Sequence, residues 1–232
     1  MQLDQITTQI RERFNRYEKA RETCLRLHRE AIRAAGLAIR AVHRGESVEA
    51  TRLIEQAATH LKTVRQSVAD QPAVYHAGFV HDAQKEYAEA ALTLALVESS
   101  PLPSPEELSV EDAAWLCGLA EAVGELRRFI LDRLRKRDTT HAESLLERMD
   151  EIYSVLTSMD YPDALTHGLR RSTDVARGCI EKTRGDLTHH LAMRDLEERI
   201  ALVRGTMECG QGVGEVTVDS TGVGRGGAAA GG

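Results

Sequence analysis

The stretch SVEDAAWLCGLAEAVGELRRFI, residues 109–130, carries the clearest helical pattern in the chain. Its apolar side chains recur every three or four residues, which is the period of one face of an α-helix. The positions of this stripe are Leu116, Leu119, Val123, Leu126 and Ile130. Ser109 is followed three residues later by Asp112, a spacing that predicts a capping box at the start of the helix. We therefore predict a long amphipathic helix that begins near Ser109.

The same helical period continues on both sides of this stretch, and glycine and proline mark the breaks. Further helices are predicted at residues 2–44, 47–69, 73–98, 139–159 and 163–203. The segment SSPLPSP, residues 99–105, contains three prolines and is predicted to be a stiff linker. No stretch shows the alternation or the β-branched density of a strand. The sequence predicts an all-α protein.

Composition limits the function classes. The chain has 232 residues, a formal net charge of -6 and only 4% aromatic residues. It therefore lacks the overall basic charge of many nucleic-acid-binding proteins, so any contact with nucleic acid must be local. No apolar run approaches the roughly 20 residues of a membrane span, and we expect a cytoplasmic protein without a membrane partner. The four cysteines are scattered without a Cys-x-x-Cys pair, which argues against a zinc or redox motif.

The chain changes character near its C-terminal end. From Gly205 onward the sequence is rich in glycine and contains too little apolar bulk to fold alone. We predict one helical domain over residues 1–204 and a disordered tail over residues 205–232.

Two glutamate pairs stand out within the predicted helices. Glu86 and Glu89 are three residues apart, and Glu121 and Glu125 are four apart. Either spacing places both carboxylates on one helix face, where like charges repel by about 0.2–0.5 kcal/mol per pair. The pairs indicate either a solvated acidic face or a site for a hard cation. Converging carboxylates suit Mg²⁺ or Mn²⁺, and such a site suits phosphodiester chemistry.

Four stretches, by their order and spacing, resemble the translin family, and most closely its translin-associated factor X branch. They are QKEYAEA (84–90), LSVED (108–112), GLAEAVGELR (118–127) and the run from Asp160 to Ala176. The resemblance covers roughly residues 5–200 and is to homologues of the archaeal or prokaryotic type. It implies an all-α fold of about seven helices, assembled as a hollow homo-oligomer, most often an octamer, that holds single-stranded RNA or DNA.

The factor X branch supplies Mg²⁺-dependent endoribonuclease activity, and the resemblance implies the same activity here. The branch's four catalytic, metal-binding acids fall on Glu86, Glu89, Glu121 and Glu125 of this chain. Glu121 stands where the family usually has Asp. The extra methylene displaces that carboxylate by about 1.5 Å, and errors near 1 Å matter in catalysis.

An acidic cluster repels RNA, so basic groups must attract the backbone, and phosphate contacts give affinity without sequence preference. The candidate RNA-binding residues are Arg33, His76, His81, Arg170 and Arg171. Further candidates are Lys182 and the basic run Arg133, Arg135, Lys136 and Arg137. Each of them could instead belong to a solvated helix face or an ion pair between subunits.

Two other functions remain open. The first is a translin-like protein that binds single-stranded RNA or DNA without hydrolysing it. The second is a structural helical oligomer whose acids form salt bridges between subunits. A di-iron carboxylate protein is disfavoured, because that site needs Glu-x-x-His on two helices and no histidine here has Glu three residues before it.

Overall fold

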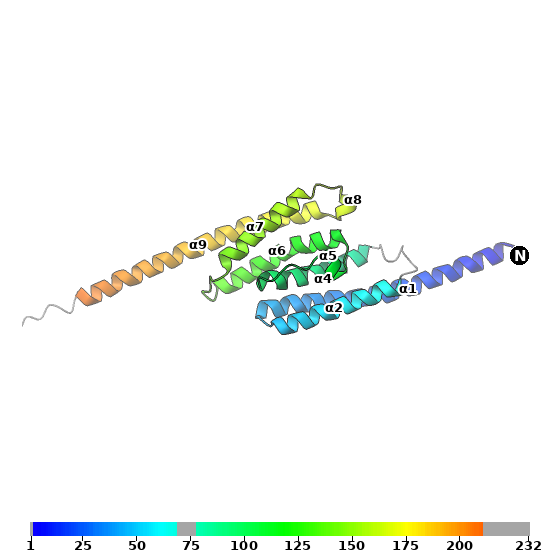
Figure 1. The fold of residues 1–232 in the computed structure, drawn as a ribbon, viewed down its shortest axis with the longest axis horizontal. Helices are drawn as coiled ribbons and strands as arrows, with labels where there is room; N and C mark the ends of the chain where they lie inside the picture. Colours follow the sequence, from blue (N-terminus) through cyan, green and yellow to red (C-terminus); the bar gives the residue numbers. More distant parts are fainter. Residues whose placement is uncertain (1, 69–77, 211–232) are drawn as a thin grey trace, which may run out of the picture. The chain divides into compact units, whose positions relative to one another are not determined.

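The computed structural model describes residues 2–68 and 78–210, which form eight helices and no strand (Figure 1). The helices are α1 (Gln2–Arg44), α2 (Ser47–Ser67), α4 (Gly78–Val97), α5 (Pro105–Leu108), α6 (Asp112–Leu134), α7 (Ala142–Ser158), α8 (Asp163–Thr166) and α9 (Leu169–Gly210). This confirms the predicted all-α class. None of these helices is both long and apolar enough to cross a membrane.

The chain divides into two compact units, Met1–Thr188 and His189–Gly232, and α9 begins in the first and continues into the second. The predicted domain boundary after residue 204 falls inside α9, which runs to Gly210. The remainder of the predicted tail lies outside the described residues. The boundary therefore stays a prediction.

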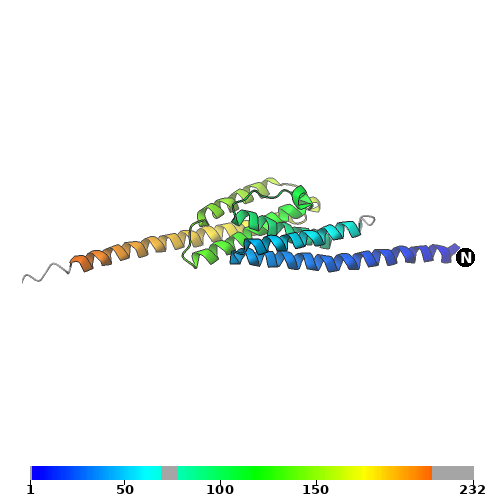
Figure 2. The same cartoon turned by 60° about the horizontal axis from the view of Figure 1, so that its bottom comes forward.

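Helices α1 and α2 form an antiparallel hairpin (Figure 2). Gly45 closes it with a φ of +77°, a backbone conformation that glycine adopts without a steric penalty. Small side chains let the two helices approach closely and meet α4. The core cluster at this junction consists of Ala35, Ala38, Ile39, Ala41, Val42, Ala50, Leu53 and Ala90.

Helix α4 packs against α1, α2 and α6, and most of its side chains from Ala83 onward are buried. It lies in close contact with α6 at Gly118. A Cβ atom there would lie 2.8 Å from the carbonyl oxygen of Lys85 and 2.9 Å from the backbone nitrogen of Glu89. Only glycine fits such a contact without a shift of one helix. The same contact brings the glutamates of α4 and α6 onto neighbouring turns.

The prediction of a capping box at Ser109 is wrong. A capping box is present at Ser104 instead, at the start of the short helix α5. Ser104 Oγ accepts a hydrogen bond from the backbone of Glu107 at 3.2 Å, and Glu107 Oε2 accepts one from the backbone of Ser104 at 2.7 Å. Pro105 occupies the first turn of α5, where its fixed φ favours the helix. Ser109 instead ends α5 with a φ of +55°, and α6 begins at Asp112 without a side-chain cap.

Candidate active site

Three of the four predicted acids converge between α4 and α6. One carboxylate oxygen each from Glu86, Glu89 and Glu121 lie within 4.8 Å of one another. Glu86 and Glu89 come from successive turns of α4, and Glu121 comes from α6, one turn after the close contact at Gly118. The two predicted helix faces therefore meet as one acidic cluster, which we call the glutamate triad.

Burial makes the charged forms of Glu86 and Glu89 unfavourable. Glu89 is only 8% exposed, and burial, followed by the charges of Glu121, Glu86 and Glu125, raises its pKa to about 8. Burial also raises the pKa of Glu86, although Lys85 opposes that shift. With a pKa of about 8, Glu89 holds a proton at neutral pH unless a cation takes its place. The triad thus offers carboxylate oxygens that a hard divalent cation could bind, and the cation would balance their negative charge.

Lys85 supplies a positive charge within the cluster. Its Nζ lies 2.8 Å from Glu121 Oε1 and 3.7 Å from Glu86 Oε1. It links the two helices through an ion pair that is only partly exposed to solvent. Lys85 belongs to the QKEYAEA stretch, but no role was predicted for it from the sequence. The signal was its place directly before Glu86, although only the packing of α4 on α6 shows which acid it meets.

The fourth predicted acid, Glu125, lies outside the triad in the structure. Its Oε2 lies 2.5 Å from Nε2 of His43 on α1 and 3.8 Å from Nη1 of Arg128. The hydrogen bond with His43 lowers the pKa of Glu125, so this carboxylate is ionised at neutral pH. Its charge nevertheless contributes to the raised pKa of Glu89, which places it close to the triad. No sequence pattern pointed to His43, because it lies 82 residues away from Glu125 in the chain.

A groove of about 620 Å³ opens beside the triad. Glu89 and Glu121 line one part of it, and His167 and Arg171 line another. The remaining lining residues are Ala120, Gly124, Gly168, Ser172, Val175, Ala176 and Cys179. A volume between about 300 and 1,000 Å³ is typical of a small-ligand site. The groove therefore has room for a ligand that contacts Glu89 and Glu121 on one part of the wall and Arg171 on another.

Among the predicted RNA-binding residues that the structure describes, only Arg171 lines the groove. Arg171 lines the groove, whereas its neighbour Arg170 is exposed and pairs with Asp160 at 3.2 Å. His81 stacks on His167, with ring centroids 4.4 Å apart. Arg33 is exposed on α1 and is not among the described residues that line the groove. His76 lies outside the described residues.

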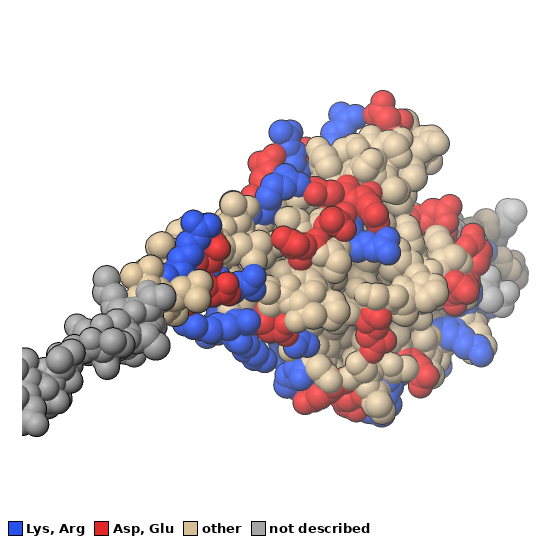
Figure 3. All heavy atoms as spheres, turned by 60° about the vertical axis from the view of Figure 1, so that its left-hand side comes forward, with Lys and Arg blue, Asp and Glu red and all other residues tan. Residues whose placement is uncertain are grey.

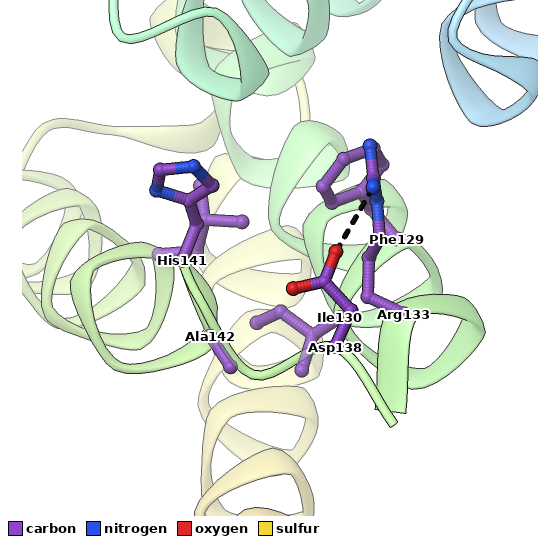
Figure 4. Close-up of a pocket in the computed structure, with 7 residues that line it drawn as sticks. Phe129, Ile130, Arg133, Asp138, His141 and Ala142 are labelled. Carbon is purple, nitrogen blue, oxygen red and sulfur yellow. Dashed lines mark hydrogen bonds and ion pairs between the residues drawn. The ribbon is translucent and has the colours of Figure 1, made fainter. Parts of the chain in front are cut away.

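The basic run at the C-terminal end of α6 begins with Arg133, which has a role in the fold. Arg133 pairs with Asp138 at 3.0 Å and lies over the ring of Phe129, 5.0 Å from its centroid (Figure 4). The small cavity between these residues and His141 measures about 10 Å³, room for about one water molecule. On the face drawn in Figure 3, acidic and basic side chains are interspersed rather than gathered into one basic patch.

Known proteins share this fold. No family model matches the chain. The uncharacterised protein MJ0175 of Methanocaldococcus jannaschii is 28% identical over 189 residues, which cover 81% of this chain and 83% of that protein. The structure of AfC3PO in complex with duplex RNA is 34% identical, with a TM-score of 0.76, and the match covers 84% of this chain and 98% of that one.

AfC3PO solved by itself matches at the same identity and TM-score, over 84% of this chain and 99% of that one. Apo-NeC3PO is 20% identical with a TM-score of 0.67, over 81% and 96% of the two chains, and shares the fold. Because identity to AfC3PO reaches 34% over almost its whole length, the chain belongs to the translin/C3PO family.

Proposed function

We propose that this protein is a Mg²⁺-dependent endoribonuclease that cleaves single-stranded RNA. The observation that carries the proposal is the glutamate triad, three carboxylates from two helices within 4.8 Å of one another beside a groove of about 620 Å³. Glu86, Glu89 and Glu121 would hold the ion. Mn²⁺ could replace Mg²⁺, because both prefer oxygen donors.

The residues present fit such an ion. Mg²⁺ is commonly held by one or two carboxylates together with water and substrate phosphate, and three carboxylates are within reach here. Burial and the neighbouring carboxylates raise the pKa of Glu89 to about 8, even with Lys85 beside Glu121, and this supports a place for a cation. When bound, Mg²⁺ would polarise a phosphate oxygen and lower the pKa of a coordinated water.

The other charged side chains have distinct proposed roles. Glu125 is ionised at neutral pH, so it can orient a water molecule and accept its proton. Arg171, on the groove wall, can contact a phosphate of the bound strand. Lys85 neutralises part of the triad and reduces its repulsion of the phosphate backbone. None of these contacts reads a base, so we expect cleavage with weak sequence preference.

We also propose that the active protein is a homo-oligomer, with the octamer of the family resemblance as the expected size. The N-terminal part of α1 exposes large apolar side chains, among them Leu3, Ile6 and Phe14. The part of α9 beyond Thr188 does the same with Met193 and Leu196. Exposed apolar side chains on long helices are typical of surfaces that a second subunit covers. Light scattering at micromolar concentration tests this, and a monomeric mass would contradict it.

Cleavage and binding must be measured on one sample. Fluorescent single-stranded RNA is incubated with the purified protein in Mg²⁺, in Mn²⁺ and in chelator, and a gel shift in chelator measures binding. Duplex RNA is included, because AfC3PO was solved with duplex RNA. We expect cleavage of the single strand only with metal. Binding without cleavage in either metal would instead support the translin-like binding function, which shares the fold but makes no use of the triad.

A further inference from the structure

We infer that His43 of α1 is a positioning residue that fixes the carboxylate of Glu125 for the site between α4 and α6. The inference rests on the proposed function, because it assigns a partner to an acid of that same site. His43 Nε2 lies 2.5 Å from Glu125 Oε2, and the His43 side chain is only 5% exposed. A histidine this deeply buried on a third helix is held by packing, so its contact fixes Glu125 from outside the α4–α6 pair.

Packing holds the imidazole against α6. The ring of His43 lies 6.4 Å from the ring of Phe129, with an interplanar angle of 35°. Phe129 follows Glu125 by one helical turn, so His43 meets two adjacent side chains on one face of α6. Phe129 is itself covered by the guanidinium of Arg133, which Asp138 holds in place. The imidazole therefore has little freedom to turn away from Glu125.

The second ring nitrogen indicates the tautomer. Nδ1 of His43 is buried, and no described group forms a hydrogen bond with it. A proton on Nδ1 would be an unsatisfied buried donor, which costs about 1–3 kcal/mol. The geometry therefore favours a ring whose Nε2 carries a proton and donates it to Glu125 Oε2. Such donors commonly orient carboxylates at metal sites.

The two carboxylate oxygens of Glu125 differ in their contacts. The contacts with His43 and with Arg128 both involve Oε2. Oε1 is then the atom that can accept from a water molecule or reach a cation at the neighbouring triad. Without the donor from α1, the carboxylate could rotate among several positions, and its contribution to the site would weaken even though the triad stayed intact.

The chain provides a matched control on the same helix. His28 is also a buried histidine of α1, only 3% exposed, and its ring meets the edge of Phe79 at 5.0 Å. It makes no contact with any glutamate of the site. His28→Leu thus measures what replacement of a buried histidine of α1 does to packing alone.

The test compares His43→Leu, which removes the donor, with His43→Gln, whose amide nitrogen can take the place of Nε2. Affinity for Mn²⁺ alone is measured by calorimetry, and single-turnover RNA cleavage is measured at saturating Mg²⁺. Loss of an outer-shell partner typically costs 10–100-fold in metal affinity or activity. We expect His43→Leu to lose about this much in at least one of the two, His43→Gln to recover most of it, and His28→Leu to lose neither.

Two results would overturn the inference. His43→Leu could match the wild type in both Mn²⁺ affinity and cleavage, or His43→Gln could be as impaired as His43→Leu, which would leave only a packing role. If the wild type binds Mn²⁺ but cleaves no RNA, the proposed function fails. The Mn²⁺ affinities of the three variants then still decide the role of His43. The double variant His43→Leu with Glu125→Gln should lose no more Mn²⁺ affinity or cleavage than Glu125→Gln alone, because both substitutions act through the same carboxylate.

Discussion

The glutamate pair of α4 and the pair of α6 differ in what their carboxylates meet. On α4, Glu86 and Glu89 both enter the triad. On α6, Glu121 joins the triad and pairs with Lys85, while Glu125 is held by His43. The α4 pair shares one environment that raises both pKa values, but on α6 the pKa of Glu125 is lowered.

Partners on other helices explain this difference. A spacing of three or four residues fixes only that two side chains share a helix face. Which of them becomes a buried acid and which an ionised one depends on the neighbouring helices. At Glu89 burial and negative neighbours dominate, whereas at Glu125 a donor from α1 dominates. The acids of the site should therefore not be interchangeable.

The largest expected effect is that of Glu89→Gln. It removes the most buried carboxylate of the triad, so we expect Mn²⁺ binding and metal-dependent cleavage to fall by about 1,000-fold or more, as for residues that act as one unit. Glu125→Gln should lower cleavage but leave more Mn²⁺ affinity, because the triad remains. Glu147→Gln, at an exposed position of α7, is the control and should behave as wild type. Equal losses of Mn²⁺ affinity at positions 89 and 125 would show that the two acids are equivalent ligands.

The next effect is that of pH on metal affinity. Because Glu89 has a pKa of about 8, a bound cation must displace its proton at lower pH. Mn²⁺ affinity should rise by up to about tenfold per pH unit between pH 6 and 8 and level off above. Calorimetry in two buffers of different ionisation enthalpy should show about one proton released per ion near pH 7. No proton release would mean that Glu89 is already ionised.

Without metal, the contribution of Glu89 to stability should fall as pH rises, whereas metal affinity should increase. The pKa of Glu89 is raised from 4.5 to about 8 in the folded protein, so between these values the folded state holds a proton that the unfolded chain has lost. Through Glu89, the free energy of unfolding is therefore largest below pH 4.5 and falls as pH rises to about 8. Thermal melts of wild type and Glu89→Gln in chelator should diverge in that range.

A smaller effect is expected where α4 and α6 touch. In Gly118→Ala the new Cβ would meet backbone atoms of α4 at 2.8 and 2.9 Å, which cannot move as a flexible side chain could. Overpacking of this kind costs about 1–3 kcal/mol, and we expect a lower melting temperature together with weaker Mn²⁺ binding. Gly36→Ala on α1 meets nothing within 4 Å and should stabilise the protein by about 0.5–1 kcal/mol. If both variants were stabilised, the helix contact would be looser than the structure shows.

The smallest expected effect is that of Lys85→Gln. Removing the ammonium group beside Glu121 and Glu86 leaves the triad more negative, so Mn²⁺ should bind more tightly. A partly exposed ion pair is worth about 1 kcal/mol, which corresponds to roughly a fivefold change in the dissociation constant. Tighter metal binding with slower cleavage would show that Lys85 also contacts the RNA. Weaker metal binding would mean that Lys85 holds the glutamates in place rather than competing with the ion.

The long helices and both glutamate pairs could be predicted from the sequence, because helical period and the spacing of side chains on one face are local properties of the backbone. The short helix α5 was not predicted, and the helix predicted at residues 163–203 is divided into α8 and α9 by His167 and Gly168, which both have positive φ. The sequence also held the signal for the capping box, which Ser104 and Glu107 form beside Pro105. The competing Ser109 pattern could not be rejected locally, because either serine could cap a helix until the path of the chain into α6 was known.

Which acids converge depends on the packing of helices that are distant in the sequence. The triad depends on the close contact at Gly118. The lowered pKa of Glu125 depends on His43, which is 82 residues away in the chain. The groove wall at Arg171 and the stack of His81 on His167 likewise join residues that no local pattern connects. Packing of distant helices sets burial and counter-charges, and these fix the protonation of each carboxylate. The sequence therefore supplied the four carboxylates, and the packing of α1, α4 and α6 determined their different environments.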